Sequence, residues 1–472
     1  MRQRAEKPGI PSPAAAGADR RRTDLAILWG VNAVDGLGSQ ASGVVFPLLL
    51  LGLGHSPGTA GTLAGSVALA GVVLGPLVAV PADRGRRRRI MTGSAALAAL
   101  GTGLLALVCL GRPALWVVVS LALLERLCSV AYEAASRGAL VRLADADALP
   151  RAAAGLQVGD QASLVLGPAL GGALFQLARP LPFLADAISY AAAAVGVRAI
   201  RTPLDTPLHA PLDTPLDTPL EATLEATLGR PLDAPRDTGP EAGHGVPRRA
   251  RARAALRGWT GAVRAGLGTV AGSPALRLVL VWTSAAGGTL TLLFYTAVFE
   301  LGRGAHGAAT GLVLAASGAA GLVGALVAPA VVRRSGAARV LTAAAWTLPV
   351  PCGALWWAGG AWGWGVAFAG LSLVLPLITV VLSSVAVACT PVPLQSRVGS
   401  VLGSAAALTA AAAPAAAGLL VTVWSTRAPV LLCTALFAVL ALCTQIRARA
   451  VVRAAKAAGA AGAVPGPGGG DE

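Results

Sequence analysis

Five ionisable residues inside long apolar stretches are the part of this sequence best suited to chemistry. They are Asp35, Glu125, Arg126, Glu133 and Asp160. A charged group at the centre of a membrane-spanning helix costs roughly 2.5–3.5 kcal/mol on insertion scales, so such residues are candidates for function. Burial favours the neutral form of a carboxyl group and a neighbouring arginine favours its charged form, so a buried acid can bind and release a proton as water access changes. We expect these five residues to couple proton movement, with Asp35 and Glu125 as the leading candidates.

The distribution of the remaining acids limits this hypothesis to one half of the chain. The second half has no acid deep in any apolar stretch, so coupling is expected in the first half. Asp186 lies near the outer end of its stretch, where we expect it to order the rim. An alternative for Glu125 is a permanent ion pair with Arg126 that only orders the helices.

The elements that must position these residues are long apolar helices. The chain has 472 residues, of which 55% are hydrophobic and 13% charged. With a mean hydropathy of +0.68, this composition excludes an ordinary water-soluble domain. A helix needs about 20 apolar residues to cross the hydrocarbon layer. About twelve such runs fall near residues 25–53, 59–81, 90–110, 114–136, 152–178, 181–200, 276–301, 307–332, 338–358, 361–389, 398–423 and 427–446. We therefore predict an all-α membrane protein with twelve transmembrane helices in two six-helix bundles.

The arginines predict the orientation of these helices. Residues 75–91, GPLVAVPADRGRRRRIM, place five arginines in a short loop between two apolar runs. The short loops expected on the same side of the membrane as this basic loop, itself included, carry twelve arginines in total. The loops expected on the opposite side carry four. Because loops rich in arginine stay in the cytoplasm, we expect a multi-pass protein of the cell membrane with both termini cytoplasmic. The net charge of +16 then reflects membrane orientation, and no nucleic-acid partner is expected.

The predicted organisation has five parts. They are a cytoplasmic N-terminal tail (1–24), a first bundle (25–200), a linker (201–262), a second bundle (263–446) and a cytoplasmic C-terminal tail (447–472). Between residues 202 and 237 the linker consists of four-residue units of the type TPLD. Proline in most units prevents a helix, and the apolar content is too low for a core. We expect a disordered cytoplasmic tether, with a recognition role for the repeat as the alternative.

Matching residues recur in the two halves at a constant separation. Arg151 and Arg397 are 246 residues apart, as are Pro168 and Pro414. Internal repeats with a binding site at their interface are common in secondary transporters. Small residues at four-residue spacing let membrane helices approach closely. We expect the four runs that carry them to line the interface between the bundles: 59–81, 152–178, 307–332 and 398–423.

Two motifs resemble a known family. The segment ADRGRRRRIM resembles the cytoplasmic loop signature of the major facilitator superfamily. The stretch LVRLADADALPRAAAGLQVGDQASLVLGPALGGALF, followed by PFLADAISY, is similar to the branch that contains the enterobactin exporter and macrolide efflux proteins. The resemblance implies proton-coupled efflux of a small amphipathic compound, such as a drug, antibiotic or siderophore-like metabolite, by alternating access. It also places Gly167, Pro168, Gly171 and Gly172 in the antiporter signature, where they would let the helix bend and pack.

The basic loop is also a candidate gate on the cytoplasmic side. Asp83 would face the N-terminus of the run 398–423, where the helix dipole and free N–H groups favour an anion. That contact would hold the two bundles together. The alternative, preferred for Arg86 and Arg89, is binding of the arginines to anionic lipid headgroups. The expected gate residues are Asp83, Arg84, Arg87, Arg88, Arg151 and Arg397.

The sequence does not favour other chemistries. The six cysteines lie in apolar runs without a CxxC pair and the four histidines lie in loops, so neither a metal nor another cofactor is expected. Neither of the two lysines follows a glycine-rich loop of the Walker A type, and no convergent catalytic set is present, so we expect no enzyme. The expected partners are a small-molecule substrate, protons and membrane lipid, with a monomer as the functional unit. The alternatives are a proton symporter or facilitator that imports a small nutrient, and a non-transporting membrane sensor.

Overall fold

The computed structural model of the chain describes residues 13–83, 85–145, 148–205, 264–302, 307–391 and 394–462, and in these ranges the regular structure is helical. The first half contains α1 (Pro13–Gly52), α2 (Pro57–Asp83), α3 (Arg87–Val108), α4 (Leu115–Leu143), α5 (Leu149–Leu177) and α6 (Leu181–Ala199). The second half contains α9 (Pro274–Leu301), α10 (Gly307–Ser335), α11 (Ala337–Thr347), α12 (Pro349–Ala354), α13 (Gly360–Ala388), α14 (Gln395–Val423) and α15 (Arg427–Gly462). The predicted all-α membrane fold is confirmed.

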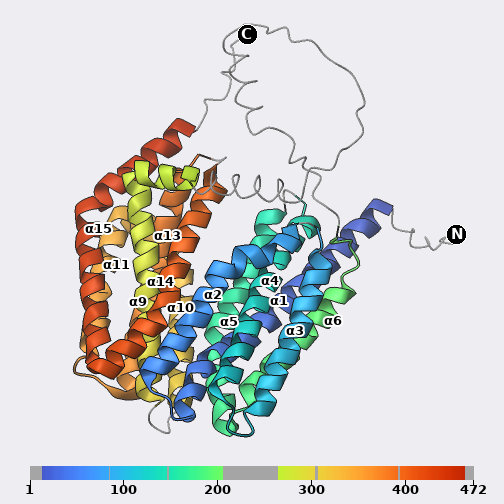
Figure 1. The fold of residues 1–472 in the computed structure, drawn as a ribbon. Coiled ribbons are helices and arrows are strands. Elements are labelled where there is room, and N and C mark those ends of the chain that lie inside the picture. The colour runs from blue at the N-terminus through green and yellow to red at the C-terminus, as the bar shows by residue number, and fades with distance from the viewer. Residues whose placement is uncertain are drawn as a thin grey trace, which may run out of the picture.

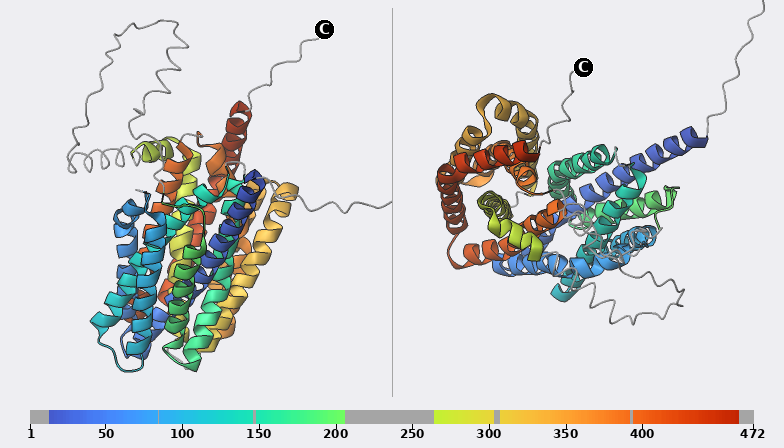
Figure 2. Two further views of the ribbon diagram at one scale, coloured as in Figure 1. Left: turned by 90° about the vertical axis from the view of Figure 1, so that its right-hand side faces the viewer. Right: turned by 90° about the horizontal axis from the view of Figure 1, so that it is seen from above.

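The helices form two adjacent groups, α1–α6 and α9–α15 (Figure 1). The view from above separates the same two groups (Figure 2). At one end of the molecule α1 begins, α6 ends, α9 begins and α15 ends, and we call this the linker end. The opposite end, where α1 turns into α2 and α14 turns into α15, is called the far end.

Ten of the described helices are long and apolar enough to cross a membrane. Two of the twelve predicted runs do not meet that measure, although both are helical. In α5 the apolar stretch found among the described residues is the shorter Leu166–Leu177. The run 338–358 is divided into α11 and α12, because Pro349 and Pro351 have no N–H to continue the helical ladder.

Some helices extend beyond the predicted bundle boundaries. α1 begins at Pro13, before residue 25, and α15 continues to Gly462, past residue 446. Most of the predicted linker, residues 206–262, lies outside the described residues, as do residues 1–12 and 463–472 of the predicted tails.

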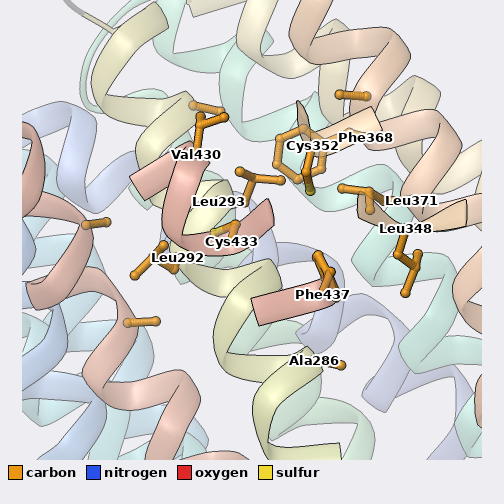
Figure 3. Packing of buried hydrophobic residues seen from close by; sticks show 14 of the residues in the cluster. Ala286, Leu292, Leu293, Leu348, Cys352, Phe368, Leu371, Val430, Cys433 and Phe437 are labelled. Atoms are coloured by element: carbon orange, nitrogen blue, oxygen red, sulfur yellow. The ribbon is translucent and has the colours of Figure 1, made fainter. Parts of the chain in front are cut away.

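The second half packs around large buried side chains. Trp282, Trp364 and Phe437 are among the largest fully buried residues, and the Trp282 Nε1–H donates a hydrogen bond to Thr444 Oγ1 at 2.7 Å. Cys352 and Cys433 lie in the same apolar cluster (Figure 3). These two cysteines therefore act as small hydrophobic residues.

Small residues bring the two halves together. α2 packs against α14 and α5 packs against α10, which confirms the predicted interface helices. A Cβ at Gly61 would overlap the carbonyl oxygen of Pro414, and a Cβ at Gly418 would overlap that of Pro57. Because α2 starts and α14 finishes at the far end, these close contacts lie in the far-end half of the molecule.

Candidate functional site

A cavity of about 470 Å³ lies inside the first bundle and reaches Tyr295 of α9. Its wall is formed mainly by α1, α2, α4 and α5. The polar and charged residues that line it are Asn32, Asp35, Ser39, Gln40, Ser42, Thr102, Glu125, Arg126, Ser129, Glu133, Ser136, Arg137, Asp160, Ser163 and Tyr295. All five residues predicted to couple protons are in this set, so the fold brings them to one cavity.

Asp35 is the most unusual group in the wall. Its side chain is only 7% exposed, and its Oδ1 has no hydrogen-bond partner in the part of the chain that the structure describes. The hydroxyl of Tyr132 on α4 is also buried and unpaired within the described ranges. An unsatisfied buried polar atom costs about 1–3 kcal/mol. The site is therefore built to receive a further polar group or a proton.

Glu125 lies at the end of a chain of two hydroxyl groups, which come from two other helices. Its Oε1 accepts a hydrogen bond from the hydroxyl of Tyr190 on α6 at 2.6 Å, and that hydroxyl lies 2.9 Å from Ser39 Oγ on α1. Arg126 points elsewhere: a Cβ on Gly71 of α2 would lie 2.8 Å from its Nε. No ion pair joins Glu125 to Arg126 among the described residues, so the alternative of a permanent pair is not what this structure contains.

Asp186 is an interior residue of the helix pair α1/α6. It is fully buried, and its Oδ2 accepts a hydrogen bond from Ser42 Oγ at 2.7 Å. A Cβ on Gly38 would lie 2.7 Å from its Oδ1, so α1 and α6 approach closely there. Asp186 lies in the second turn of α6, so its ordering role would act between these two packed helices near the far end.

The hydroxyl groups that hold these acids were not predicted from the sequence. Asn32, Asp35, Ser39 and Ser42 follow a spacing of three and four residues, which puts them on one face of α1. That spacing alone predicts a polar face on this helix. Tyr190 gave no comparable signal, because its role depends on the packing of α6 against α1 and α4.

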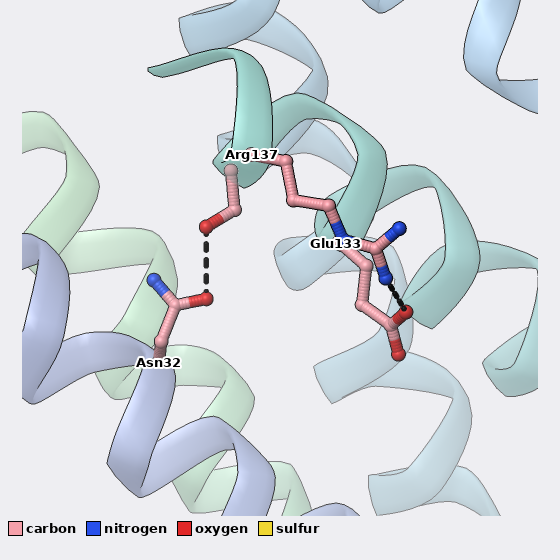
Figure 4. Close-up of polar contacts among 4 residues, drawn as sticks. Asn32, Glu133 and Arg137 are labelled. Atoms are coloured by element: carbon pink, nitrogen blue, oxygen red, sulfur yellow. Dashed lines mark hydrogen bonds and ion pairs between the residues drawn. The ribbon is translucent and has the colours of Figure 1, made fainter. Parts of the chain in front are cut away.

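The linker end of the cavity carries exposed charges. Arg137 Nη2 lies 3.0 Å from Glu133 Oε2, an ion pair within α4 (Figure 4). Beside it, Ser136 Oγ donates a hydrogen bond to Asn32 Oδ1 at 2.9 Å (Figure 4). Asp160 of α5 is exposed and lines the same region. Solvent therefore reaches the cavity from the linker end, whereas Asp35 lies deeper.

The predicted gate residues lie in separate places in this structure. Arg87 is buried, and a Cβ on Gly138 of α4 would lie 2.6 Å from its Nε. Arg88 binds carbonyl groups just after α6. Asp83 is the last residue of α2, but its side chain is not among the parts that the structure describes, and Arg84 lies outside the described residues.

The other side of the predicted gate is the start of α14. Arg151 is exposed at the start of α5, and Arg397 lies in the first turn of α14. Val398, next to Arg397, is buried against Val270 and Leu276. The start of α14 therefore packs against the segment 264–272 and α9 within the second half.

The glycines of α5 face α1. A Cβ on Gly167 would overlap Gln40, and one on Gly171 would overlap the carbonyl oxygen of Ala41. Pro168 and Gly172 are buried in the same stretch of α5. This stretch therefore provides the close packing of α5 on α1 that positions Asp35 opposite α4. In the described ranges no group of three or more His, Cys, Asp or Glu residues is arranged to hold a metal ion.

Comparison with known proteins agrees with this architecture. A family model of the Major Facilitator Superfamily matches residues 28–387, which is more than half of the chain. The chain therefore belongs to the Major Facilitator Superfamily. A search of the curated proteins gives no significant match.

Solved structures of other transporters share the fold. A POT family transporter in complex with a thioalcohol-conjugated peptide has a TM-score of 0.61 at 13% identity, with 90% of this chain and 96% of that chain covered. A bacterial homologue of the human lysosomal transporter Spinster, inward-facing and unoccupied, has a TM-score of 0.55 at 15% identity, with 93% and 96% covered. A bacterial homologue of the iron transporter ferroportin, inward-facing, has a TM-score of 0.57 at 16% identity, with 89% and 99% covered. Family and fold together define a multi-pass membrane transporter.

Proposed function

We propose that this protein exports a small amphipathic organic compound, such as a drug, antibiotic or siderophore-like metabolite, in exchange for protons. The observation that carries the proposal is the Asp35 carboxylate, buried in the cavity wall with Oδ1 unpaired among the described residues. A proton or a polar group of the substrate can relieve the cost of that unpaired atom. If only one of them binds at a time, loading of substrate displaces the proton, which is the coupling that exchange requires.

Glu125 is the second proton site in this proposal. It lines the same cavity and keeps a hydrogen bond from Tyr190, so its position is set by α6. Arg126, one residue further along α4, would favour the charged state of the cavity acids. Glu133 and Asp160, nearer the linker end, would pass protons between the cavity and solvent.

Alternating access would use the contacts between the halves. The far-end contact of Gly61 with Pro414 closes the cavity on one side, and the exposed charges at the linker end leave the other side open. In the opposite state, Asp83 with Arg84, Arg87 and Arg88 would approach α14 and close the linker end, while α5 bends at Pro168. The linker end would be cytoplasmic, as the arginine distribution indicates.

One further observation supports export, and two others support a small organic substrate. The sequence resembles the branch of enterobactin and macrolide exporters, and POT family neighbours are described with a thioalcohol-conjugated peptide and with 5-aminolevulinic acid. The cavity of about 470 Å³ is within the usual range for small organic ligands. A small organic molecule is therefore the substrate class that best fits the cavity, and the protein would act as a monomer in the cell membrane.

The test is transport of antibiotics, dyes and siderophores into inverted membrane vesicles, with and without a pH gradient. We expect gradient-dependent uptake of at least one compound by the unaltered protein, and loss of that dependence in Asp35→Asn. Asp145→Asn is the matched control, because Asp145 is exposed and pairs with Arg21 outside the cavity. Uptake in right-side-out vesicles alone would favour nutrient import, and an unchanged pH dependence in Asp35→Asn would refute the role of Asp35.

A further inference from the structure

The first unit of the linker repeat is built into the first bundle. α6 ends at Ala199, and residues 200–205 have the sequence IRTPLD. Residues 202–205 are therefore a complete TPLD unit whose structure is described. Thr202, Leu204 and Asp205 of this unit contact α1 or α3.

Asp24 of α1 holds the threonine of the unit. Its buried carboxylate accepts hydrogen bonds from the Thr202 N–H at 2.7 Å, the Thr202 hydroxyl at 2.6 Å and the Arg201 N–H at 3.1 Å. Hydrogen bonds to a charged acceptor are about twice as strong as neutral ones. An alanine at position 202 would lose one of the three bonds.

α3 holds the two ends of the unit. Arg88 donates from Nη2 to the carbonyl oxygens of Ile200 and Thr202, the latter at 3.1 Å. Asp205 Oδ1 accepts a hydrogen bond from the backbone N–H of Arg88 at 2.8 Å. That N–H belongs to the first turn of α3, and Arg86 at its N-cap makes no side-chain capping bond within the described ranges. Asp205 therefore supplies the cap for α3.

The two central residues of the unit have opposite environments. Leu204 is fully buried in a cluster with Leu28, Met91 and Val197. Pro203 is exposed, and it has no N–H that needs a partner. The site therefore fits a hydroxyl at the first position, an apolar side chain at the third and a carboxylate at the fourth, and it accommodates proline at the exposed second position.

We infer that Asp24, Arg88 and the N-terminus of α3 form a binding site for the sequence TPLD, and that residues 214–217 are its alternative occupant. Residues 214–217 are an identical TPLD unit, twelve positions further along the chain. The two units between them and the unit that follows each differ from TPLD at one position: TPLH at 206–209 lacks the acid, APLD at 210–213 lacks the hydroxyl, and TPLE at 218–221 has the longer acid.

Unit 202–205 holds the site in this structure because it is tethered directly to α6. A short tether gives a high effective concentration, which falls as the tether lengthens. Seating of 214–217 would require residues 200–205 to leave the site and would move the anchor of the linker by twelve positions. This inference is independent of the proposed transport.

Hydrogen exchange measured by mass spectrometry on the full-length protein tests the inference. In the unaltered protein we expect protection at the Arg201 and Thr202 amides and none at the equivalent amides of Asp213 and Thr214. In the variant Thr202→Ala/Asp205→Ala, protection should move to Asp213 and Thr214. Each charge-assisted hydrogen bond corresponds to a protection of roughly tenfold or more.

Two controls make the outcome decisive. Adding Thr214→Ala/Asp217→Ala should remove the new protection, whereas adding Thr218→Ala/Glu221→Ala should leave it. Thermal unfolding of each variant checks that the bundle remains folded. Two outcomes would show that the inference is wrong. In the first, unit 202–205 of the variant loses its protection and no protection appears at residues 213 and 214. In the second, protection at residues 213 and 214 remains after Thr214→Ala/Asp217→Ala is added. As a further check, His209→Asp in the Thr202→Ala/Asp205→Ala background creates a nearer TPLD unit at 206–209. The amides of position 205 and Thr206 should then be protected in place of those of Asp213 and Thr214.

Discussion

The contact between Gly61 and Pro414 should control which end of the transporter is open. A Cβ at Gly61 would overlap the Pro414 carbonyl oxygen and lie 3.0 Å from the Gly418 Cα. These atoms belong to the backbone of α14 and have no rotamer with which to move aside. Gly61→Ala should therefore destabilise the state in which the far end is closed.

The magnitude follows from the cost of overpacking. Inserting a methyl group into a close-packed contact costs about 1–3 kcal/mol, which corresponds to a shift of roughly 5–150-fold between two conformations. Alanine also stabilises an isolated helix by about 0.8–1.0 kcal/mol relative to glycine. Gly93→Ala in α3 makes the same change in helix propensity. A Cβ at Gly93 would meet no described atom within 4 Å. Gly93→Ala is therefore the matched control.

The assay is a distance distribution between spin labels at the exposed positions Ser56 and Ser425, which flank the far-end contact. Cys389 and Cys443, which are not fully buried, are replaced by alanine in every sample so that they do not react. We expect Gly61→Ala to enrich the longer distances and Gly93→Ala to leave the distribution unchanged. Identical distributions for the two variants would refute the idea that this contact closes the far end.

Four further substitutions, one of them a control, test the packing and the cavity. Phe437→Ala should lower the free energy of unfolding by about 3–5 kcal/mol, because the ring is fully buried; Leu110→Ala, at a side chain that is 75% exposed, should change it by less than about 0.5 kcal/mol. Tyr190→Phe should destabilise the protein by about 1.5–3 kcal/mol, because Glu125 loses its hydrogen bond, and a neutral effect would show that the bond is not formed. Arg137→Gln should cost less than about 0.5 kcal/mol, since the pair with Glu133 is exposed. Thermal and denaturant unfolding in one detergent measure all of these.

Hydropathy was sufficient to predict the helices, because each must bury or present a continuous apolar surface over the thickness of the membrane. The division of the run 338–358 also had a local cause, since Pro349 and Pro351 are visible in the sequence. The extension of α1 back to Pro13 was not expected, because the polar first turns of that helix have no apolar run to mark them.

The site was predicted only as far as its charged residues. A buried acid is conspicuous in an apolar run, which is why Asp35 and Glu125 were found. The hydroxyl groups near Glu125 depend on the way three helices meet: its partner Tyr190 comes from α6, and Ser39, which contacts Tyr190, comes from α1. Likewise, counting arginines indicated the side of the membrane on which Arg88 lies, but not that its side chain binds the chain just after α6.

The most direct test of the central claim measures protons released when a transported compound binds. The purified protein is mixed with that compound in weakly buffered solution containing a pH indicator. We expect the unaltered protein and Asp145→Asn to release protons on binding, and Asp35→Asn to bind the compound with that release abolished or reduced. Proton release by Asp35→Asn equal to that of the unaltered protein would contradict the assignment of Asp35 as the group at which substrate and proton exchange.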